Sequence, residues 1–229
     1  MAQRLRGKQI AILATHGFEQ SELIEPKHLL EAEGARVSVV SPAKEASIKG
    51  WKDKDWGDSV AVDQPLDGAD AGRFDALVLP GGVINPDTLR TNEAVLDFIR
   101  SMAEAGKPVA AICHGPWLLI NSGLAKGHEV TSWPSLQQDL ANAGARWRDA
   151  EVVVDGNLIT SRKPADIPAF SEAVVKALPY LAGAYWPSTP AGTRLPRFWL
   201  KVTTSLPFFT CADCTCRAPS RPATAGSSL

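Results

Sequence analysis

Short apolar runs alternate with longer polar segments along the first 180 or so residues of the chain. The runs at 8–14, 74–79 and 109–112 show little alternation of apolar and polar residues, which is typical of strands buried on both faces of a parallel sheet. Further strands are predicted at 36–40, 59–63, 129–132, 151–154 and 158–161. The last two flank Asp155-Gly156-Asn157, and Asp-Gly between β-rich runs predicts a hairpin.

Helices are predicted between these strands, over residues 18–34, 93–105, 135–143 and 166–178. The first of them carries four apolar residues on one face: Leu23, Ile24, Leu29 and Leu30. Gly34 ends this helix, and Pro26 inside it predicts irregular first turns. Residues 42–58 are polar and contain Gly and Trp, so we expect a surface excursion. Strands and helices that alternate at this spacing predict a doubly wound α/β fold, with a mostly parallel sheet between helices.

The composition of the chain changes near residue 183. We expect one domain over residues 1–182 and a proline-rich extension over 183–229, disordered in large part. The extension carries Cys211, Cys214 and Cys216 in a C-x-x-C-x-C pattern. Three sulfurs without a nearby histidine are fewer than the four ligands of a closed zinc site. The sequence therefore predicts no metal and no cofactor.

Charge and hydropathy exclude several classes of partner. The formal net charge is −1, which gives no electrostatic reason to expect binding to nucleic acid or to an anionic membrane. No apolar stretch reaches the roughly 18 residues of a membrane span. The predicted domain holds a single cysteine, Cys113, and so cannot form a disulfide within itself. A reducing, cytoplasmic location is the expectation.

The candidate chemistry centres on Cys113-His114-Gly115-Pro116, which follows the apolar run 109–112 directly. A second apolar run begins at Trp117, so the predicted order is strand, sharp turn and helix. This is the layout of a nucleophile elbow, in which a reactive side chain stands on a strained turn above the sheet. A cysteine after an apolar strand is otherwise typical of the core, but this tetrapeptide at the junction favours a reactive thiol.

Two further loops are expected at the same edge of the sheet, because ligands in such folds bind at the carboxyl ends of the strands. Gly81-Gly82 follows the strand at 74–79, and glycine amides there could approach a substrate oxygen as an oxyanion hole requires. Glu19 and Glu22 follow the first strand. A protonated carboxyl beside a thiol can donate a hydrogen bond to the thiolate and lower the pKa of the cysteine. An acidic pair at a helix start can also simply offset the helix dipole.

These stretches resemble the ThiJ/PfpI family of the class I glutamine amidotransferase-like superfamily. The resemblance covers roughly residues 7 to 182 and is greatest to the PfpI-like bacterial branch. The matching segments are GFEQSEL (17–23), FDALVLPGGVINPD (74–87), KPVAAICHGPWLL (107–119), TSWPSL (131–136), NAGARW (142–147) and EVVVDGNLITSRKPADIPAF (151–170). The family fold is a flavodoxin-like α/β sandwich. Glutamine amidotransferase activity itself is not expected, because the downstream His-x-Glu of that class is missing.

The resemblance implies roles for particular residues. Cys113 matches the family nucleophile, and His114 matches the histidine beside it. Glu22 matches the carboxylic acid that contacts the sulfur, with Glu19 as the second acidic residue of that motif. Asp87 matches an acidic residue that reaches the histidine from a neighbouring subunit, which implies a homo-oligomer. Because His114 is adjacent to Cys113 in sequence, it can face the sulfur only if the turn is bent, so a base role for His114 requires such a turn.

Four other positions complete the expected site. Gly81 and Gly82 match the loop on the oxyanion side. Trp133 stands where some relatives of the family carry a tyrosine near the pocket, so an indole replaces a phenol there. His16 precedes the Gly-Phe-Glu motif, where it either lines the site or is a solvated turn residue.

Three functions are consistent with these residues. The resemblance favours a stress-response enzyme, acting as a glutathione-independent glyoxalase or a deglycase, in which Cys113 attacks a small reactive carbonyl or its adduct on a protein or peptide. The alternatives are an intracellular cysteine peptidase of the PfpI type and a redox sensor or chaperone whose cysteine is oxidised. A small enclosed site favours the first function, and an open groove favours the second.

Overall fold

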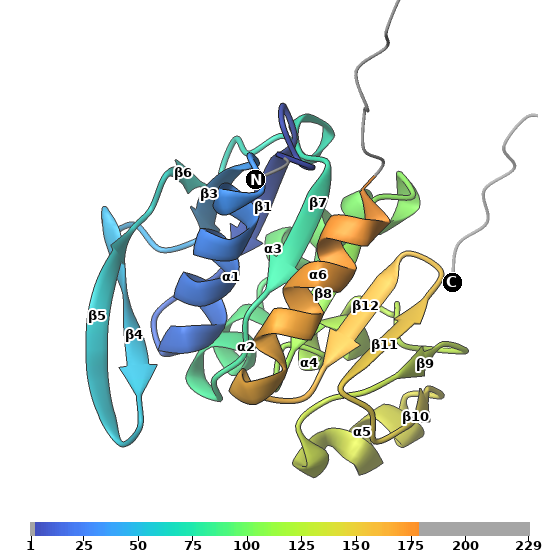
Figure 1. The fold of residues 1–229 in the computed structure, drawn as a ribbon. Coiled ribbons are helices and arrows are strands. Elements are labelled where there is room, and N and C mark those ends of the chain that lie inside the picture. The colour runs from blue at the N-terminus through green and yellow to red at the C-terminus, as the bar shows by residue number, and fades with distance from the viewer. Residues whose placement is uncertain (1–2, 179–229) are drawn as a thin grey trace, which may run out of the picture. The chain divides into compact units, whose positions relative to one another are not determined.

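The structure is a computed structural model that describes residues 3–178 of the chain. Within these residues a seven-stranded sheet has the strand order β11-β12-β8-β7-β1-β3-β6 (Figure 1). All of its neighbouring strands are parallel except β11 and β12, which form the predicted hairpin. The strands are β1 (Gln9–Leu13), β3 (Arg36–Ser41), β6 (Gln64–Pro65), β7 (Ala76–Leu79), β8 (Val109–Ile112), β11 (Val152–Asp155) and β12 (Leu158–Ser161). The predicted doubly wound α/β fold is confirmed.

Helices cover both faces of the sheet, because successive residues of each buried strand point to opposite sides. Ile10 and Ile12 of β1 join the core beneath α1 and α6, whereas Ala11 and Leu13 join the core beneath α3. The helices are α1 (Gln20–Ala32), α2 (Ile84–Leu89), α3 (Glu93–Glu104), α4 (Trp117–Asn121), α5 (Gln137–Asn142) and α6 (Ile167–Ala177), with 3-10 turns η1 (Ala71–Arg73), η2 (Pro134–Leu136) and η3 (Pro164–Asp166).

Residues 42–58 lie largely at the surface, as predicted, but the strands within them were not predicted. The chain there forms β4 (Ser47–Lys52) and β5 (Asp55–Ala61), an antiparallel hairpin that pairs with β2 (Phe18–Glu19) outside the main sheet (Figure 1). Most of its side chains are at least partly exposed, and Ile48 is a fully buried exception. A hairpin that buries so few side chains lacks the apolar pattern by which strands are recognised in sequence. The strand predicted at 59–63 is the end of β5.

The first predicted helix is shorter than expected. Phe18 and Glu19 are extended and pair with β4, so α1 begins at Gln20, and the buried Pro26 is accommodated inside the helix. Leu23 and Leu30 are buried as predicted, but Leu29 is 42% exposed. Gly34 follows the helix with a φ of +92°, a conformation suited to glycine.

The segment 129–147 forms a small parallel pair, β9 (Glu129–Val130) with β10 (Arg146–Trp147), around η2 and α5. The predicted extension 183–229 and its three cysteines lie outside the described residues. Across residues 3–178, no helix combines the length and the apolar character that crossing a membrane requires.

The packing of α6 yields a stability prediction. Phe170 is fully buried in the core that α6 shares with α1 and the sheet. We expect Phe170→Ala to lower the free energy of unfolding by about 3–5 kcal/mol, because it removes buried apolar surface and leaves a cavity. The control is Val154→Ala, since Val154 on β11 is 57% exposed and its truncation should change stability by less than about 0.5 kcal/mol. Similar losses in the two variants, measured by urea unfolding, would contradict the packing described.

Candidate active site

Cys113 stands on a strained turn between β8 and α4. Its φ is +62°, and among the described residues Asp53 is the only other non-glycine residue with a positive φ. The left-handed conformation costs an L-residue roughly 1–2 kcal/mol. Backbone hydrogen bonds stabilise the turn: the Cys113 N–H donates to the Ser161 carbonyl at 3.0 Å, and the Cys113 carbonyl accepts from the Trp133 N–H at 2.9 Å. The elbow geometry expected from the sequence is therefore present.

The bend of this turn brings two consecutive side chains together. The Cys113 Sγ lies 3.2 Å from the Nδ1 of His114, within hydrogen-bonding range for sulfur. Burial lowers the pKa of His114, so its imidazole is favoured in the neutral form, which can accept a proton. The bent turn on which a base role for His114 depends is thus observed.

Glu22 supplies a buried carboxyl group to the same site. It is fully buried, and its Oε2 accepts a hydrogen bond of 2.9 Å from the Gly81 N–H. Its buried Oε1 has no hydrogen-bond partner among the described residues. The pKa of Glu22 is raised to about 8, mainly by burial. Hydrogen bonding to Gly81 and Cys113 lowers this pKa, but by less than burial raises it. The carboxyl is therefore mostly protonated at pH 7.

The protonation state of Glu22 affects the pKa of the Cys113 thiol. Burial raises the pKa of Cys113, and a charged Glu22 raises it further by repulsion and hydrogen bonding, whereas the N–H groups of His114 and Gly82 lower it. When Glu22 is protonated, the repulsion disappears and an O–H donor is available to the sulfur. A neutral Glu22 thus favours the thiolate, and an ionised Glu22 opposes it.

The Gly81-Gly82 loop wraps closely around these two side chains. A Cβ on Gly81 would lie 2.6 Å from the Glu22 Oε2 and 2.7 Å from the Cys113 Cβ, so only glycine fits there. The Gly81 N–H is already bonded to Glu22. This corrects the expectation that both glycine amides face a substrate oxygen. The N–H groups of Gly82 and His114 are the ones near the sulfur.

Asn85, which the sequence analysis did not single out, holds this loop in place. It is fully buried, and its Oδ1 accepts from the Thr15 N–H at 2.8 Å. Its Nδ2 donates to the carbonyls of Pro80 and Gly81 at 3.0 and 3.2 Å. Asn85 therefore joins the loops that follow β1 and β7. The signal available in the sequence was a polar residue shortly after Pro-Gly-Gly, which is too common in turns to be decisive.

Trp133 lies beside the site, as expected. The ring of His114 stacks on that of Trp133, with centroids 6.1 Å apart and planes inclined by 25°. The Trp117 ring lies on another side of the imidazole, at 5.3 Å. Trp133 is 39% exposed, so part of its indole reaches the surface next to His114.

Three other expected residues are not brought to the sulfur within this chain. The Asp87 carboxylate pairs with the Arg90 guanidinium on α2. The Nδ1 of His16 accepts from the backbone N–H of Lys49 in β4, and its Nε2 lies 3.8 Å from a Glu45 carboxylate oxygen. His16 therefore contacts the β4–β5 hairpin, which agrees with its alternative interpretation as a turn residue.

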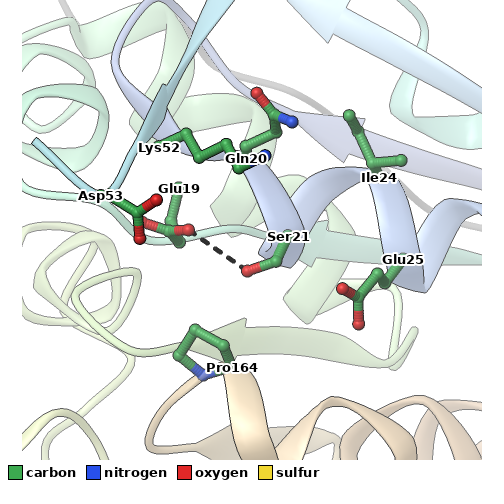
Figure 2. Close-up of a pocket in the computed structure, with 8 residues that line it drawn as sticks. All are labelled: Glu19, Gln20, Ser21, Ile24, Glu25, Lys52, Asp53 and Pro164. Atoms are coloured by element: carbon green, nitrogen blue, oxygen red, sulfur yellow. Dashed lines mark hydrogen bonds between the residues drawn. The ribbon is translucent and has the colours of Figure 1, made fainter. Parts of the chain in front are cut away.

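Glu19 borders a separate cavity of about 390 Å³ between α1, the β4–β5 turn and Pro164 (Figure 2). Its Oε1 accepts a hydrogen bond from the Ser21 hydroxyl at 3.2 Å, and burial raises the pKa of the carboxyl. The cavity is lined by Glu19, Gln20, Ser21, Ile24, Glu25, Lys52, Asp53 and Pro164. Neither Cys113 nor Glu22 lines this cavity. Glu19 nevertheless adjoins the thiol site, because its N–H donates to the Gly81 carbonyl at 3.3 Å and its charge raises the pKa of Glu22.

Comparisons with known proteins place this arrangement in a family. The family model described as "DJ-1/PfpI family" matches residues 8–177. The chain belongs to the DJ-1/PfpI family. The elbow cysteine, the buried Glu22 and the glycine loop thus lie in the part of the chain that this DJ-1/PfpI match covers.

The relatives of this DJ-1/PfpI protein include named enzymes. A deglycase from Thermococcus kodakarensis is 46% identical over 170 residues, which cover 74% of this chain and 99% of that protein. Protein/nucleic acid deglycase 2 from Escherichia coli is 40% identical over 172 residues, 75% of this chain and 98% of that protein. The crystal structure of Drosophila melanogaster DJ-1beta has a TM-score of 0.69 at 31% identity, and the match covers 78% of this chain and 91% of that one. These similarities support an enzymatic role in general terms.

The burial of Glu22 predicts a pH-dependent stability. Its pKa is about 8 in the folded state against an ordinary value of 4.5, so folding stability is greatest below pH 4.5 and falls as the pH rises towards 8. Gln keeps the shape and cannot ionise. We expect Glu22→Gln to gain stability over the wild type by about 1.4 kcal/mol for each pH unit in that interval.

Urea unfolding at pH 5, 6.5 and 8 measures this difference. Glu25→Gln is the matched control, because Glu25 is an exposed carboxylate on the same helix. Its unfolding curves should follow those of the wild type at every pH. The assignment fails if the difference in unfolding free energy between Glu22→Gln and the wild type is the same at all three pH values. Glu22 would then be ionised in the folded protein.

Proposed function

We propose that this protein is a cysteine-dependent stress-response enzyme that acts on reactive carbonyls, as a deglycase or a glutathione-independent glyoxalase. The observation that carries the proposal is the buried Glu22 carboxyl group, mostly protonated at pH 7 beside the Cys113 thiol. An acid that keeps its proton at neutral pH next to a nucleophile suits a reaction that adds a thiol to a carbonyl and then moves protons. Several relatives are named deglycases.

The proposed reaction starts with attack of the Cys113 sulfur on the aldehyde carbon of methylglyoxal, while the carbonyl oxygen takes up a proton. The product is a hemithioacetal. On a glycated amine, the same attack displaces the amine from its aminocarbinol and frees the protein or peptide. In this proposal the N–H groups of Gly82 and His114, which lie near the sulfur, stabilise the developing oxyanion.

The remaining steps move a hydrogen and add water. A base removes the proton from the former aldehyde carbon, and a proton is returned to the neighbouring carbon through an enediol, which gives a thioester of lactate on Cys113. His114 Nδ1 and Glu22 are the two groups close to the sulfur that could carry these protons. Water then hydrolyses the thioester to lactate and the free thiol. The sum is methylglyoxal plus water to lactate, without an external oxidant or glutathione.

The burial of the thiol favours a small substrate over an extended peptide. Cys113 is only 7% exposed, and the tight approach of Gly81 leaves little room on that side. A peptidase requires the scissile bond of an extended chain to reach the sulfur, which suits an open groove. We therefore place peptide hydrolysis second to carbonyl chemistry for this site.

The decisive experiment is incubation of the protein with methylglyoxal in the absence of glutathione, with lactate followed by NMR. We expect lactate from the wild type and a loss of at least about a hundredfold in Cys113→Ala, because no other group replaces the nucleophile. The variant retains Cys211, Cys214 and Cys216, so it also controls for adventitious thiols. Equal lactate formation by both proteins, or by neither, would reject the proposal. Cleavage of a casein substrate by the wild type alone would favour the peptidase.

We also propose that activity depends on assembly of a homo-oligomer in which Asp87 of a neighbouring subunit approaches His114. Asp87 is exposed at the surface and bound to Arg90, so it is accessible to a second subunit. We expect specific activity to fall when the protein is diluted through its dissociation range, as measured by lactate formation alongside light scattering. The control is dilution of a chemically cross-linked sample, whose specific activity should stay constant. Constant specific activity in a verified monomer would contradict the dependence on assembly.

A further inference from the structure

The two ring nitrogens of His114 face two different side chains. The Nδ1 lies 3.2 Å from the Cys113 Sγ, and the Nε2 lies 3.4 Å from the Oγ of Ser135. Ser135 belongs to η2, two residues after Trp133, so it approaches the imidazole from a segment far from the elbow in sequence. Among the described residues, no other side chain is hydrogen-bonded to the Nε2.

The plane of the imidazole is fixed by its aromatic neighbours. Trp133 stacks on the ring, and Trp117 packs against it at a steeper inclination of 59°. Trp117 is itself held, because its Nε1–H donates to the Asp139 carboxylate at 2.9 Å and the Arg90 guanidinium lies 4.7 Å from its ring centroid. These rings pack against the imidazole, and each of its nitrogens faces one side chain.

A neutral imidazole carries one N–H, and the partner of one nitrogen decides the state of the other. A hydroxyl oxygen at Nε2 can accept a hydrogen bond from an Nε2–H. The lone pair is then on Nδ1 and is directed at the Cys113 thiol, as a base requires. When Nδ1 takes up the thiol proton, the Nε2–H still donates to the same hydroxyl, so no rearrangement accompanies the transfer.

We propose that Ser135 is a positioning residue that holds His114 as the Nε2–H tautomer and so directs Nδ1 at the Cys113 thiol. A role of the Ser135–His114 contact in catalysis rests on the proposed function. The contact itself is independent of that function. Within one chain, the charged groups around the imidazole leave this role to the hydroxyl. Glu22 approaches from the side of the sulfur, and both Asp139 and the Asp87–Arg90 pair reach the imidazole only through Trp117 or its surroundings. An Asp87 carboxylate from a neighbouring subunit, as proposed above, would add a second acceptor for the same Nε2–H.

The test is the tautomer of His114, measured from the ¹⁵N chemical shifts of its ring nitrogens in protein labelled at histidine. The chain has four histidines, and His114→Gln assigns the signal. We expect the Nε2–H tautomer in the wild type. Ser135→Ala should mix the tautomers and lower the pKa of His114, because the imidazolium loses an acceptor. Ser135→Thr, which keeps the hydroxyl, should have the tautomer and the His114 pKa of the wild type.

Alkylation of Cys113 by iodoacetamide at pH 7 gives a second readout that needs no substrate. We expect the rate to fall about two- to tenfold in Ser135→Ala, the value of one neutral hydrogen bond, and to be retained in Ser135→Thr. The matched control is Gln138→Ala, an exposed residue on the neighbouring helix α5 whose side chain bonds to Asn142. It should leave the tautomer, the pKa and the alkylation rate unchanged.

Two results would overturn the proposal. One is an Nδ1–H tautomer in the wild type; the other is a Ser135→Ala variant whose His114 tautomer and pKa match the wild type. In the second case, a changed His114 tautomer or pKa in Asp87→Asn would assign the positioning role to Asp87 of a neighbouring subunit instead. This test can fail independently of the proposed function. If the wild type has the expected tautomer but forms no lactate, only the carbonyl chemistry is rejected. If it forms lactate but Ser135→Ala changes nothing, only the positioning role of Ser135 is rejected.

Discussion

The left-handed backbone at Cys113 determines the surroundings of the thiol. With a φ of +62°, the chain reverses so sharply after β8 that the next side chain, His114, turns back towards the sulfur. The same reversal places the Cys113 Cβ against Gly81 and the Cys113 carbonyl against the amide of Trp133. An ordinary right-handed turn would separate sulfur and imidazole. Strain of this kind persists because several backbone hydrogen bonds around the turn over-determine it.

The carboxyl group of Glu22 is the second constraint, and it acts through burial. No cation faces it among the described contacts, and one of its oxygens has no hydrogen-bond partner there. Such a group is costly to ionise, so the fold keeps it protonated at neutral pH at the expense of stability above that range. Strongly shifted pKa values of this type are concentrated in sites where proton transfer matters. The carboxyl and the thiol form one coupled unit, because the charge of either opposes the charge of the other.

The parallel sheet brings these groups together from distant parts of the chain. Glu22 follows β1, the glycine loop follows β7, and Cys113 follows β8. In the sheet, β7 lies between β1 and β8, so the three segments meet at one edge. Asn85 ties the first two loops to each other through the backbone. The segment 131–136 then closes the remaining side of His114 with an indole and a hydroxyl. Precise placement therefore depends on the register of the sheet and on buried backbone hydrogen bonds, more than on direct contacts between the reactive side chains.

The class of fold and the position of the elbow could be predicted from the order of the amino acids. Uniformly apolar runs mark strands that are buried on both faces, so the strand before Cys113 was predicted with its observed bounds, and the Asp-Gly hairpin was found from its turn residues. The residues around the elbow pointed to His114 and to the glycine loop with Gly81, and the resemblance to the ThiJ/PfpI family pointed to Glu22. These features depend on local pattern and backbone chemistry, which a sequence displays directly.

The outer hairpin and the polar contacts of the site depend on how the chain packs in three dimensions. The β4–β5 hairpin has few buried side chains, so its strands carry no apolar signal, and Leu29 shares a helical spacing with the core without reaching it. The use of the Gly81 amide by Glu22, the bond from the Thr15 amide to Asn85 and the approach of Ser135 to His114 join residues that are 21 to 70 positions apart. Contacts across such separations arise from the packing of the sheet and its loops, and no local pattern encodes which polar group will find which partner.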